Sequence, residues 1–292
     1  MSETSEGTEN RLENLQAIKP LITALRTKSL STLQSALNRK NLLHDYQYDY
    51  QKILSTLILL RKKQNRYPHR SDTGESGIPY LIILGSERGI CGSFDKTLVN
   101  SAVGWASKQK TKYCILTYGK RLSPDLNNRD IEFKPQGSLS VGALPKYRIA
   151  HNLVKGWLKD FDHSILISLE ILSFRKSKGD AYKPKLTSLL PFLHDSGNHN
   201  DYDIDWPPPI IDGDPEHIIE RSFEHLTAIS FYEIILESIA AENYFRYNLL
   251  EEAKKNIDEL VDLLTTITQI AKRAAITQQI QELSVGAGLT ND

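Results

Sequence analysis

Cysteine is scarce in this chain of 292 residues, and the chain has no excess of positive or negative side chains. The two cysteines, Cys91 and Cys114, do not form a CxxC pair, which excludes a disulfide framework and a cysteine-rich zinc site and favours a reducing compartment. Lys plus Arg and Asp plus Glu both total 36, so the chain lacks the overall positive charge that attracts nucleic acid or anionic membranes. Because 40% of the residues are hydrophobic and 25% are charged, we expect a folded, globular protein.

Long apolar runs are also missing. The longest, such as residues 81–84, have the length of a strand and fall far below the roughly 18 residues that cross a bilayer. The first ten residues, MSETSEGTEN, are polar and contain three Glu, which matches neither a signal peptide nor an Arg-rich transit peptide. We therefore expect a disordered N-terminal tail and, if the protein works at a membrane, attachment through partners.

Glycine and proline are absent from residues 216–285, which predicts one long helix. It is expected to begin at Asp214 and Pro215, because Asp is a good N-cap and Pro suits the first helical position. Roughly 70 residues at about 1.5 Å each give roughly 105 Å of helix, a length that needs a partner helix. A heptad seam with alternating steps of four and three residues is formed by Ala253, Ile257, Leu260, Leu264, Ile267, Ala271 and Ala274.

The N-terminal residues 11–66 show a matching heptad pattern, which Ser29, Thr32 and Arg39 interrupt. Pro20 is expected to start or kink the main helix, because it lacks an amide hydrogen and clashes with the preceding turn. The apolar and aromatic seam positions are Leu15, Ile18, Ile22, Leu25, Ala36, Leu43, Tyr46, Tyr50, Ile53, Leu57 and Leu60.

The middle of the chain has a different pattern, in which short apolar runs alternate with helical segments after a polar linker at residues 67–79. Strands are expected at residues 80–84, 112–118, 164–174 and 184–192, and helices at 95–109 and 145–160. The predicted class is α/β: a long antiparallel coiled coil of the N- and C-terminal helices (11–66 and 214–285) plus a central, Rossmann-like α/β domain (78–193). The alternative is that both helices pack flat on the sheet.

Candidate chemistry is weak in this sequence. The loop GSERGICGS at residues 85–93 lies between a strand and a helix, but it is neither GxGxxG nor a P-loop, so its glycines are expected to serve turn geometry. No feature places a base beside Cys91, and a calcium loop starting at Asp201 would need glycine where Trp206 stands. We therefore expect no catalytic residue, no cofactor and no metal site.

Three segments nevertheless resemble the gamma subunit of F-type ATP synthases. The C-terminal helix carries most of the likeness, with SIAAE at residues 238–242, AAITQ at 274–278 and the upstream stretch 231–237. The loop at residues 85–94 is similar to the family's loop after the first strand, whereas the N-terminal helix matches in pattern more than in letters. The resemblance spans about residues 11–285.

The resemblance implies a non-catalytic rotor shaft without a cofactor. Its helical end would turn inside the ring of alpha and beta subunits, and its α/β foot would bind the epsilon subunit and the membrane c-ring, on the cytoplasmic face of a bacterial or archaeal cell membrane. The contacts with the catalytic ring that the resemblance implies are Lys272, Arg273, Thr277 and Gln278. The structural loop that it implies contains Gly85, Arg88, Gly89, Cys91 and Gly92.

Two other hypotheses stay open. A free-standing α/β enzyme with helical dimerisation arms would bind a nucleotide or small acid at the loop of residues 85–93. A passive coiled-coil scaffold would form a homodimer through its seam instead of pairing its own two ends.

Overall fold

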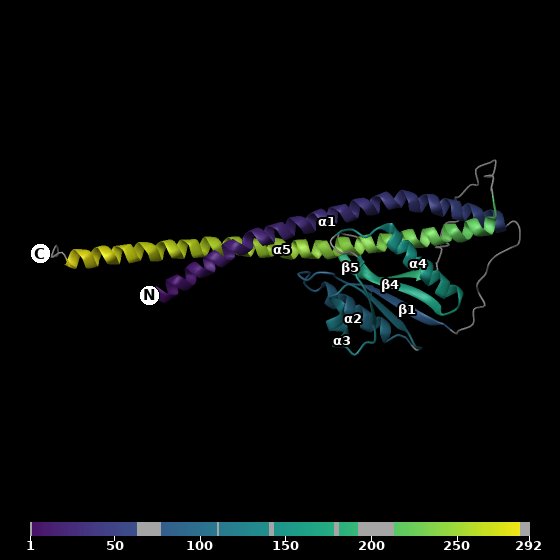
Figure 1. Ribbon diagram of the computed structural model, residues 1–292, viewed down its shortest axis with the longest axis horizontal. Helices are drawn as coiled ribbons and strands as arrows, with labels where there is room; N and C mark the ends of the chain where they lie inside the picture. Colours follow the sequence, from purple (N-terminus) through teal and green to yellow (C-terminus); the bar gives the residue numbers. More distant parts are fainter. Residues whose placement is uncertain are drawn as a thin grey trace. The chain divides into compact units, whose positions relative to one another are not determined.

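The computed structural model describes residues 2–62, 77–109, 111–139, 143–177, 181–191 and 213–286 (Figure 1). Its elements are α1 (Ser2–Lys62), β1 (Ile78–Leu84), α2 (Phe94–Ala106), β2 (Cys114–Tyr118), α3 (Leu122–Asn127), β3 (Lys134–Gly137), α4 (Tyr147–Asp162), β4 (Leu166–Lys176), β5 (Tyr182–Leu190) and α5 (Pro215–Gly286). None of the described helices is both long and apolar enough to cross a membrane. The chain divides into unit 1 (Met1–Leu30 with Arg246–Asp292) and unit 2 (Ser31–Phe245), which are described separately.

A five-stranded sheet in the order β3-β2-β1-β4-β5 forms the centre of unit 2. The first four strands in this order are parallel, and β5 pairs antiparallel with β4. The chain winds in one direction from β1 through β2 to β3 and then crosses β1 to reach β4. The expected α/β domain with a Rossmann-like, doubly wound core is therefore confirmed, together with the long helix at each end of the chain.

Alternation along the strands builds a core on each face of the sheet, because successive side chains point to opposite sides. Leu81 and Ile83 of β1 pack with α2 and α3, whereas Ile82 and Leu84 pack with α4, with α5 and with Ala36 of α1. Figure 1 shows α2 and α3 on the side of the sheet away from α5. Both long helices thus contribute to the core of unit 2, so the α/β domain is not an independent appendage.

Two elements of unit 2, helix α3 and strand β3, were not expected from the sequence. All four residues of β3 are exposed, so the strand has no apolar alternation by which it could be recognised. Helix α3 has only six residues, with Leu122 and Leu126 buried. The remaining strands and helices lie where the apolar runs predicted them, with ends that differ by a few residues.

Histidine and tyrosine side chains gather where α1, α4 and α5 meet in unit 2. The ring centroid of His225 on α5 lies 5.8 Å from that of Tyr50 on α1 and 5.0 Å from that of His151 on α4. Nδ1 of His225 is 3.3 Å from the Tyr147 hydroxyl, and Nε2 of His151 is 3.0 Å from a carboxylate oxygen of Glu224. Burial, and then the nearby His151, lower the pKa of His225. This junction therefore favours a neutral His225.

In unit 1 the two long helices run antiparallel. Nζ of Lys19 on α1 lies 2.8 Å from a carboxylate oxygen of Asp258 on α5, and Arg26 pairs with Glu251. The guanidinium of Arg26 also lies over the ring of Tyr247, 5.5 Å from its centroid. The earlier residue of α1, Lys19, pairs with the later residue of α5, Asp258. This order confirms the antiparallel pairing expected of the two ends of the chain.

The residues of α5 that are buried in the structure differ from the heptad positions predicted from the sequence. Leu260 is 38% exposed and Ile267 is 43% exposed, whereas the neighbouring Thr268 is only 7% exposed and Val261 is partly buried. The expectation for Leu260 and Ile267 is therefore wrong by one residue, because a helix of 3.6 residues per turn drifts out of a strict heptad and lets polar side chains share the buried face. The expected positions that are partly buried are Ala253, Ile257, Leu264 and Ala271.

Three of the expected seam positions of α1 are exposed as well. Ile18, Tyr46 and Ile53 are 44%, 63% and 47% exposed, while Lys19 is partly buried and Leu54 is 3% exposed. Lys19 pairs with Asp258 of α5 at this point, while 44% of its side chain stays exposed. The side chains of residues 57 and 60 lie outside the described part of the chain.

The start of α1 also differs from expectation. The helix runs without interruption from Ser2 through Pro20, so residues 2–10 are helical and not a disordered tail. Pro20 lacks the amide hydrogen for one intrahelical hydrogen bond, but it is exposed, and the helical bonds on both sides of it are retained.

Candidate functional site

The last part of α5 in unit 1 exposes an unusual amount of apolar surface. Its large aliphatic side chains that are between 43% and 73% exposed are Leu263, Ile267, Ile270, Ile276, Ile280, Leu283 and Val285. The first three lie on one side of the helix and the next three on roughly the opposite side, because each residue advances by about 100°. One neighbouring helix can cover only one side of α5. This pattern therefore indicates a partner that encloses the end of α5.

Helix α1 does not reach the end of α5. Nζ of Lys272 lies 3.1 Å from a carboxylate oxygen of Glu9, and α1 begins at Ser2, seven residues or about two turns beyond that pair. The antiparallel pairing thus leaves the final residues of α5, up to Gly286, without α1 beside them, as Figure 1 also shows. We call residues 263–286 the α5 tip.

All four side chains implied as contacts with the catalytic ring lie on the α5 tip and are exposed. Lys272 has 65% of its side chain exposed despite its pairing with α1. The hydroxyl of Thr277 donates to the carbonyl oxygen of Arg273 at 2.9 Å, and the amide of Gln278 donates to a carboxylate oxygen of Glu282 at 2.9 Å. The structure therefore brings two cations and two polar groups onto the same exposed segment as the aliphatic side chains.

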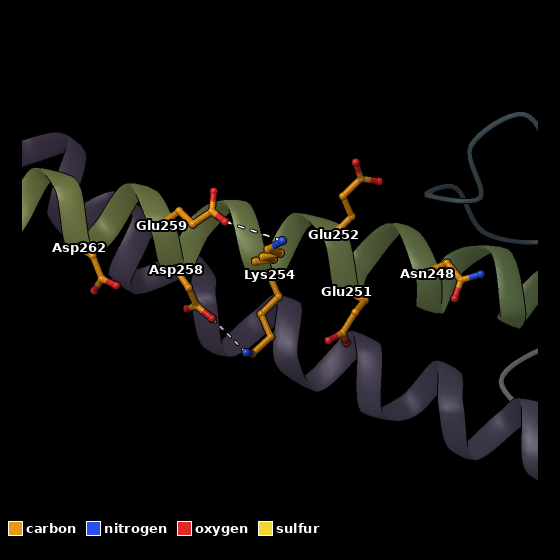
Figure 2. A pocket seen from close by; sticks show the side chains of 8 residues that line it. Asn248, Glu251, Glu252, Lys254, Asp258, Glu259 and Asp262 are labelled. Atoms are coloured by element: carbon orange, nitrogen blue, oxygen red, sulfur yellow. Dashed lines mark hydrogen bonds and ion pairs between the residues drawn. The ribbon is translucent and has the colours of Figure 1, made fainter.

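A shallow hollow lies further back on α5 in unit 1 and is strongly charged (Figure 2). Nζ of Lys254 is 3.0 Å from a carboxylate oxygen of Asp258, and Nζ of Lys255 is 4.0 Å from one of Glu259. Pairs four residues apart on one helix are typical of a solvated surface. Within the described residues, no group of three or more His, Cys, Asp and Glu side chains could hold a metal ion. We therefore assign the hollow no ligand.

In unit 2, the loop after β1 is shaped by close backbone packing. A Cβ on Gly85 would come within 2.3 Å of the Leu122 side chain, and one on Gly119, whose φ is +102°, would come within 2.5 Å of the Gly85 carbonyl oxygen. The amide of Gly85 donates to the carbonyl oxygen of Tyr118 at 2.8 Å. Glycine is required here because the loops after β1 and β2 touch each other.

The rest of this loop turns back on itself around a buried thiol. Cys91 is 4% exposed, and its Sγ lies 3.3 Å from the carbonyl oxygen of Arg88 and 3.6 Å from that of Gly89. Gly92 has φ of +59°, a left-handed conformation in which glycine is favoured. This geometry supports a structural role for the loop and gives Cys91 the setting of an inert core thiol.

The place where a doubly wound sheet usually binds a nucleotide is largely filled. Ligands of such sheets lie at the carboxyl ends of the strands where the winding reverses, which here is the end of β1. Ser238 of α5 reaches the Leu84 carbonyl oxygen at 3.4 Å, and the remaining cavity of about 30 Å³ holds little more than a water molecule. Both the amide and the hydroxyl of Ser86 donate to the carboxylate of Asp95, whose pKa is raised by burial.

Nearly the whole chain is similar to known proteins. A family model described as ATP synthase matches residues 4–288. Among curated proteins, the ATP synthase gamma chain of Clostridium botulinum (strain Okra / Type B1) is 22% identical over 96% of both chains, and that of Geobacter sp. (strain M21) is 25% identical over 71% of both. The gamma chain of Stenotrophomonas maltophilia (strain K279a) is 23% identical over 96% of both chains.

Solved structures show the same fold. A chain in the Euglena gracilis mitochondrial ATP synthase, in a structure described as OSCP/F1/c-ring, has a TM-score of 0.61 at 12% identity, covering 100% of this chain and 98% of its own. A chain in the central stalk and c-ring of the Tetrahymena thermophila mitochondrial ATP synthase has a TM-score of 0.57 at 17% identity, covering 80% of this chain and 99% of its own. With the family model spanning nearly its full length, the chain belongs to the ATP synthase family.

Proposed function

We propose that this chain is the gamma-type central rotor shaft of an F-type ATP synthase or ATPase. The observation that carries the proposal is the α5 tip, whose aliphatic side chains lie on opposite sides of one helix and need a partner that surrounds it. The catalytic ring of alpha and beta subunits is such a partner. The names of the curated relatives and of the structural neighbours support the same role.

The mechanism requires that the shaft have different faces. A shaft that stands inside a ring of three catalytic sites presents a different face to each, and it shifts a site between open and closed states only by contacting them with different free energies. Each tenfold change in nucleotide affinity requires about 1.4 kcal/mol of such a difference. On the α5 tip, Lys272 and Arg273 supply charge in a setting of apolar side chains. Their asymmetric placement suits them to distinguish the sites.

The chain itself is proposed to be non-catalytic. The cavity that the described residues leave at the end of β1 is about 30 Å³, far smaller than a nucleotide, which argues against the free-standing enzyme. The ion pairs between its own two ends argue against a scaffold that homodimerises through the seam. In this proposal the α/β domain is the foot that binds the epsilon subunit and the c-ring, on the cytoplasmic face of a bacterial or archaeal membrane.

Co-expression tests the proposal. The tagged chain is produced with the alpha and beta subunits of its own source, and the ATPase activity of the purified complex is measured. We expect one copy of this chain per ring, and turnover that falls when both Lys272 and Arg273 are changed to alanine. Alanine at Lys255, which lies on the same helix and has 78% of its side chain exposed, is the control and should leave turnover unchanged. A chain that elutes alone and never joins the ring would refute the rotor assignment.

A further inference from the structure

A buried carboxylate in unit 2 joins the sheet to both long helices. Glu237 on α5 is 3% exposed, and its Oε1 accepts the backbone N–H of Lys176, the last residue of β4, at 2.8 Å. Its Oε2 lies 2.9 Å from Nζ of Lys40 on α1 and 3.0 Å from Nε of Arg175 on β4. Three elements that are far apart in the sequence therefore meet at one carboxylate.

A second carboxylate balances the charge of this group. Glu233, one turn earlier on α5, lies 3.2 Å from a terminal guanidinium nitrogen of Arg175 and 3.4 Å from Nζ of Lys40. Burial pushes the pKa of Glu237 upward, but the N–H of Lys176 and the two cations outweigh burial and leave that pKa below its ordinary value. Lys40, Arg175, Glu233 and Glu237, called the Glu237 cluster below, are thus two cations and two carboxylates that are at most partly exposed.

Stability alone gives little reason for such a cluster, because well-packed apolar residues often stabilise a fold as much as a buried ion pair does. The cluster differs from apolar packing in being directional. Charge-assisted hydrogen bonds require particular lengths and angles, whereas the hydrophobic effect has no preferred direction. Beside the cluster, α5 contributes the apolar side chains of Ile234, Ile235 and Leu236 to the core on this side of the sheet. A force that twists the sheet against the helices therefore acts strongly on the cluster.

We propose that Glu237 is a positioning residue for torque transfer, which fixes the α/β domain against rotation relative to α1 and α5. The inference rests on the proposed rotor function, in which ion flow turns the foot and the helices must turn with it. Glu237 touches no reacting group and acts through Lys40 and Arg175. When the cluster is intact, the foot and the helices rotate together. When it is broken, part of each rotational step is lost as slippage between sheet and helices.

The test uses the complete ATP synthase in membrane vesicles, with Glu237→Gln in this chain. Gln has the same size and still accepts the Lys176 N–H, but it has no charge with which to hold the two cations. Ion transport and ATP hydrolysis are measured on the same vesicles. We expect hydrolysis to be retained and ion transport per ATP to fall by about half or more, because removing one partner of a buried pair strongly weakens its geometry. Glu220→Gln, at an exposed position of α5 in the same unit, is the matched control.

Two further measurements keep the proposal open to refutation if the first variant assembles poorly. Lys40→Gln removes the α1 cation alone, at a partly exposed site, and should lower the same ratio to a smaller extent. With the ring immobilised and a bead on the α/β domain, angular fluctuations should be broader for Glu237→Gln than for the control. Ratios and fluctuations equal to those of the control would overturn the role of Glu237 while leaving the rotor function intact. A wild-type chain that never joins the ring would instead refute the rotor function.

Discussion

Aspartate placed at residue 268 or at residue 267 distinguishes the observed seam of α5 from the one that the apolar heptad predicts. Thr268 is 7% exposed and its hydroxyl has no hydrogen-bond partner among the described residues, whereas Ile267 is 43% exposed. Thr268→Asp keeps the side-chain size but places a carboxylate against α1. Ile267→Asp places the same carboxylate largely in water.

The cost of Thr268→Asp has an upper limit set by protonation. An aspartate that cannot stay charged takes up a proton, and from an ordinary pKa of about 3.9 this costs roughly 4 kcal/mol at neutral pH. We therefore expect Thr268→Asp to lower the free energy of unfolding by about 2–4 kcal/mol, and Ile267→Asp by about 1 kcal/mol from lost apolar contact. Since burial raises the pKa of the new carboxyl, its cost should diminish as the pH falls towards the ordinary pKa of aspartate.

Urea unfolding of the full chain, followed by far-UV circular dichroism, measures both values. Thr268→Asn is the matched control, since it has the shape of Asp without the charge and should remove most of the loss. If Ile267→Asp proves more damaging than Thr268→Asp, α5 is rotated relative to α1 by one residue and the apolar heptad is right after all.

Three further predictions concern unit 2. Phe231→Ala should lower the free energy of unfolding by about 3–5 kcal/mol, because the ring is fully buried and packs edge-on to Trp157 with 4.9 Å between the ring centroids. Urea unfolding followed by tryptophan fluorescence measures this loss. A loss below about 1 kcal/mol would contradict the packing. The lowered pKa of His225 means that the unfolded chain binds a proton more readily. The stability contributed by the neutral ring is therefore complete above the ordinary histidine pKa of about 6.5 and is lost as the pH falls from there through the lower pKa of the folded chain. His225→Gln should flatten this pH dependence of the unfolding midpoint, and an unchanged slope would exclude His225 as its source. Gly119→Ala should destabilise the fold by more than about 1 kcal/mol in a thermal melt, because residue 119 has a positive φ and its new Cβ would meet the Gly85 backbone. An unchanged melting temperature would show that the loops after β1 and β2 separate easily.

The long elements were predictable because their signals are long. Seventy residues without glycine or proline leave few alternatives to a helix, and an Asp-Pro start marks its first turn; Glu216 N–H donates to the Asp214 carboxylate at 3.1 Å, as a capped helix requires. The apolar runs of β1 and β4 identified strands because both faces of those strands are buried. Strand β3 could not be recognised in the same way, since an exposed edge strand imposes little on its side chains.

The rotation of each helix about its own axis was harder to predict than its existence. Thr268 takes the buried position beside the exposed Ile267 and so moves the seam of α5 by one residue, which a count of apolar letters does not register. The candidate site was located only in part. The cations at residues 272 and 273 came from the family resemblance, while the aliphatic side chains around them were overlooked because Ile276 and Ile280 do not follow the seam. Those off-seam apolar residues were the available signal.

The pairing of α1 with α5 limits which insertions and deletions of residues the two helices can accept. Arg26 pairs with Glu251, and seven residues earlier in α1 Lys19 pairs with Asp258, seven residues later in α5. Between these pairs both helices advance by the same two turns, so an insertion of one residue in either would rotate everything beyond it by about 100° and separate the partners. Lengthening of this helix pair is therefore tolerated in steps of seven residues made in both helices at once. The lengths of two segments that lie more than two hundred residues apart in the chain are therefore coupled in evolution.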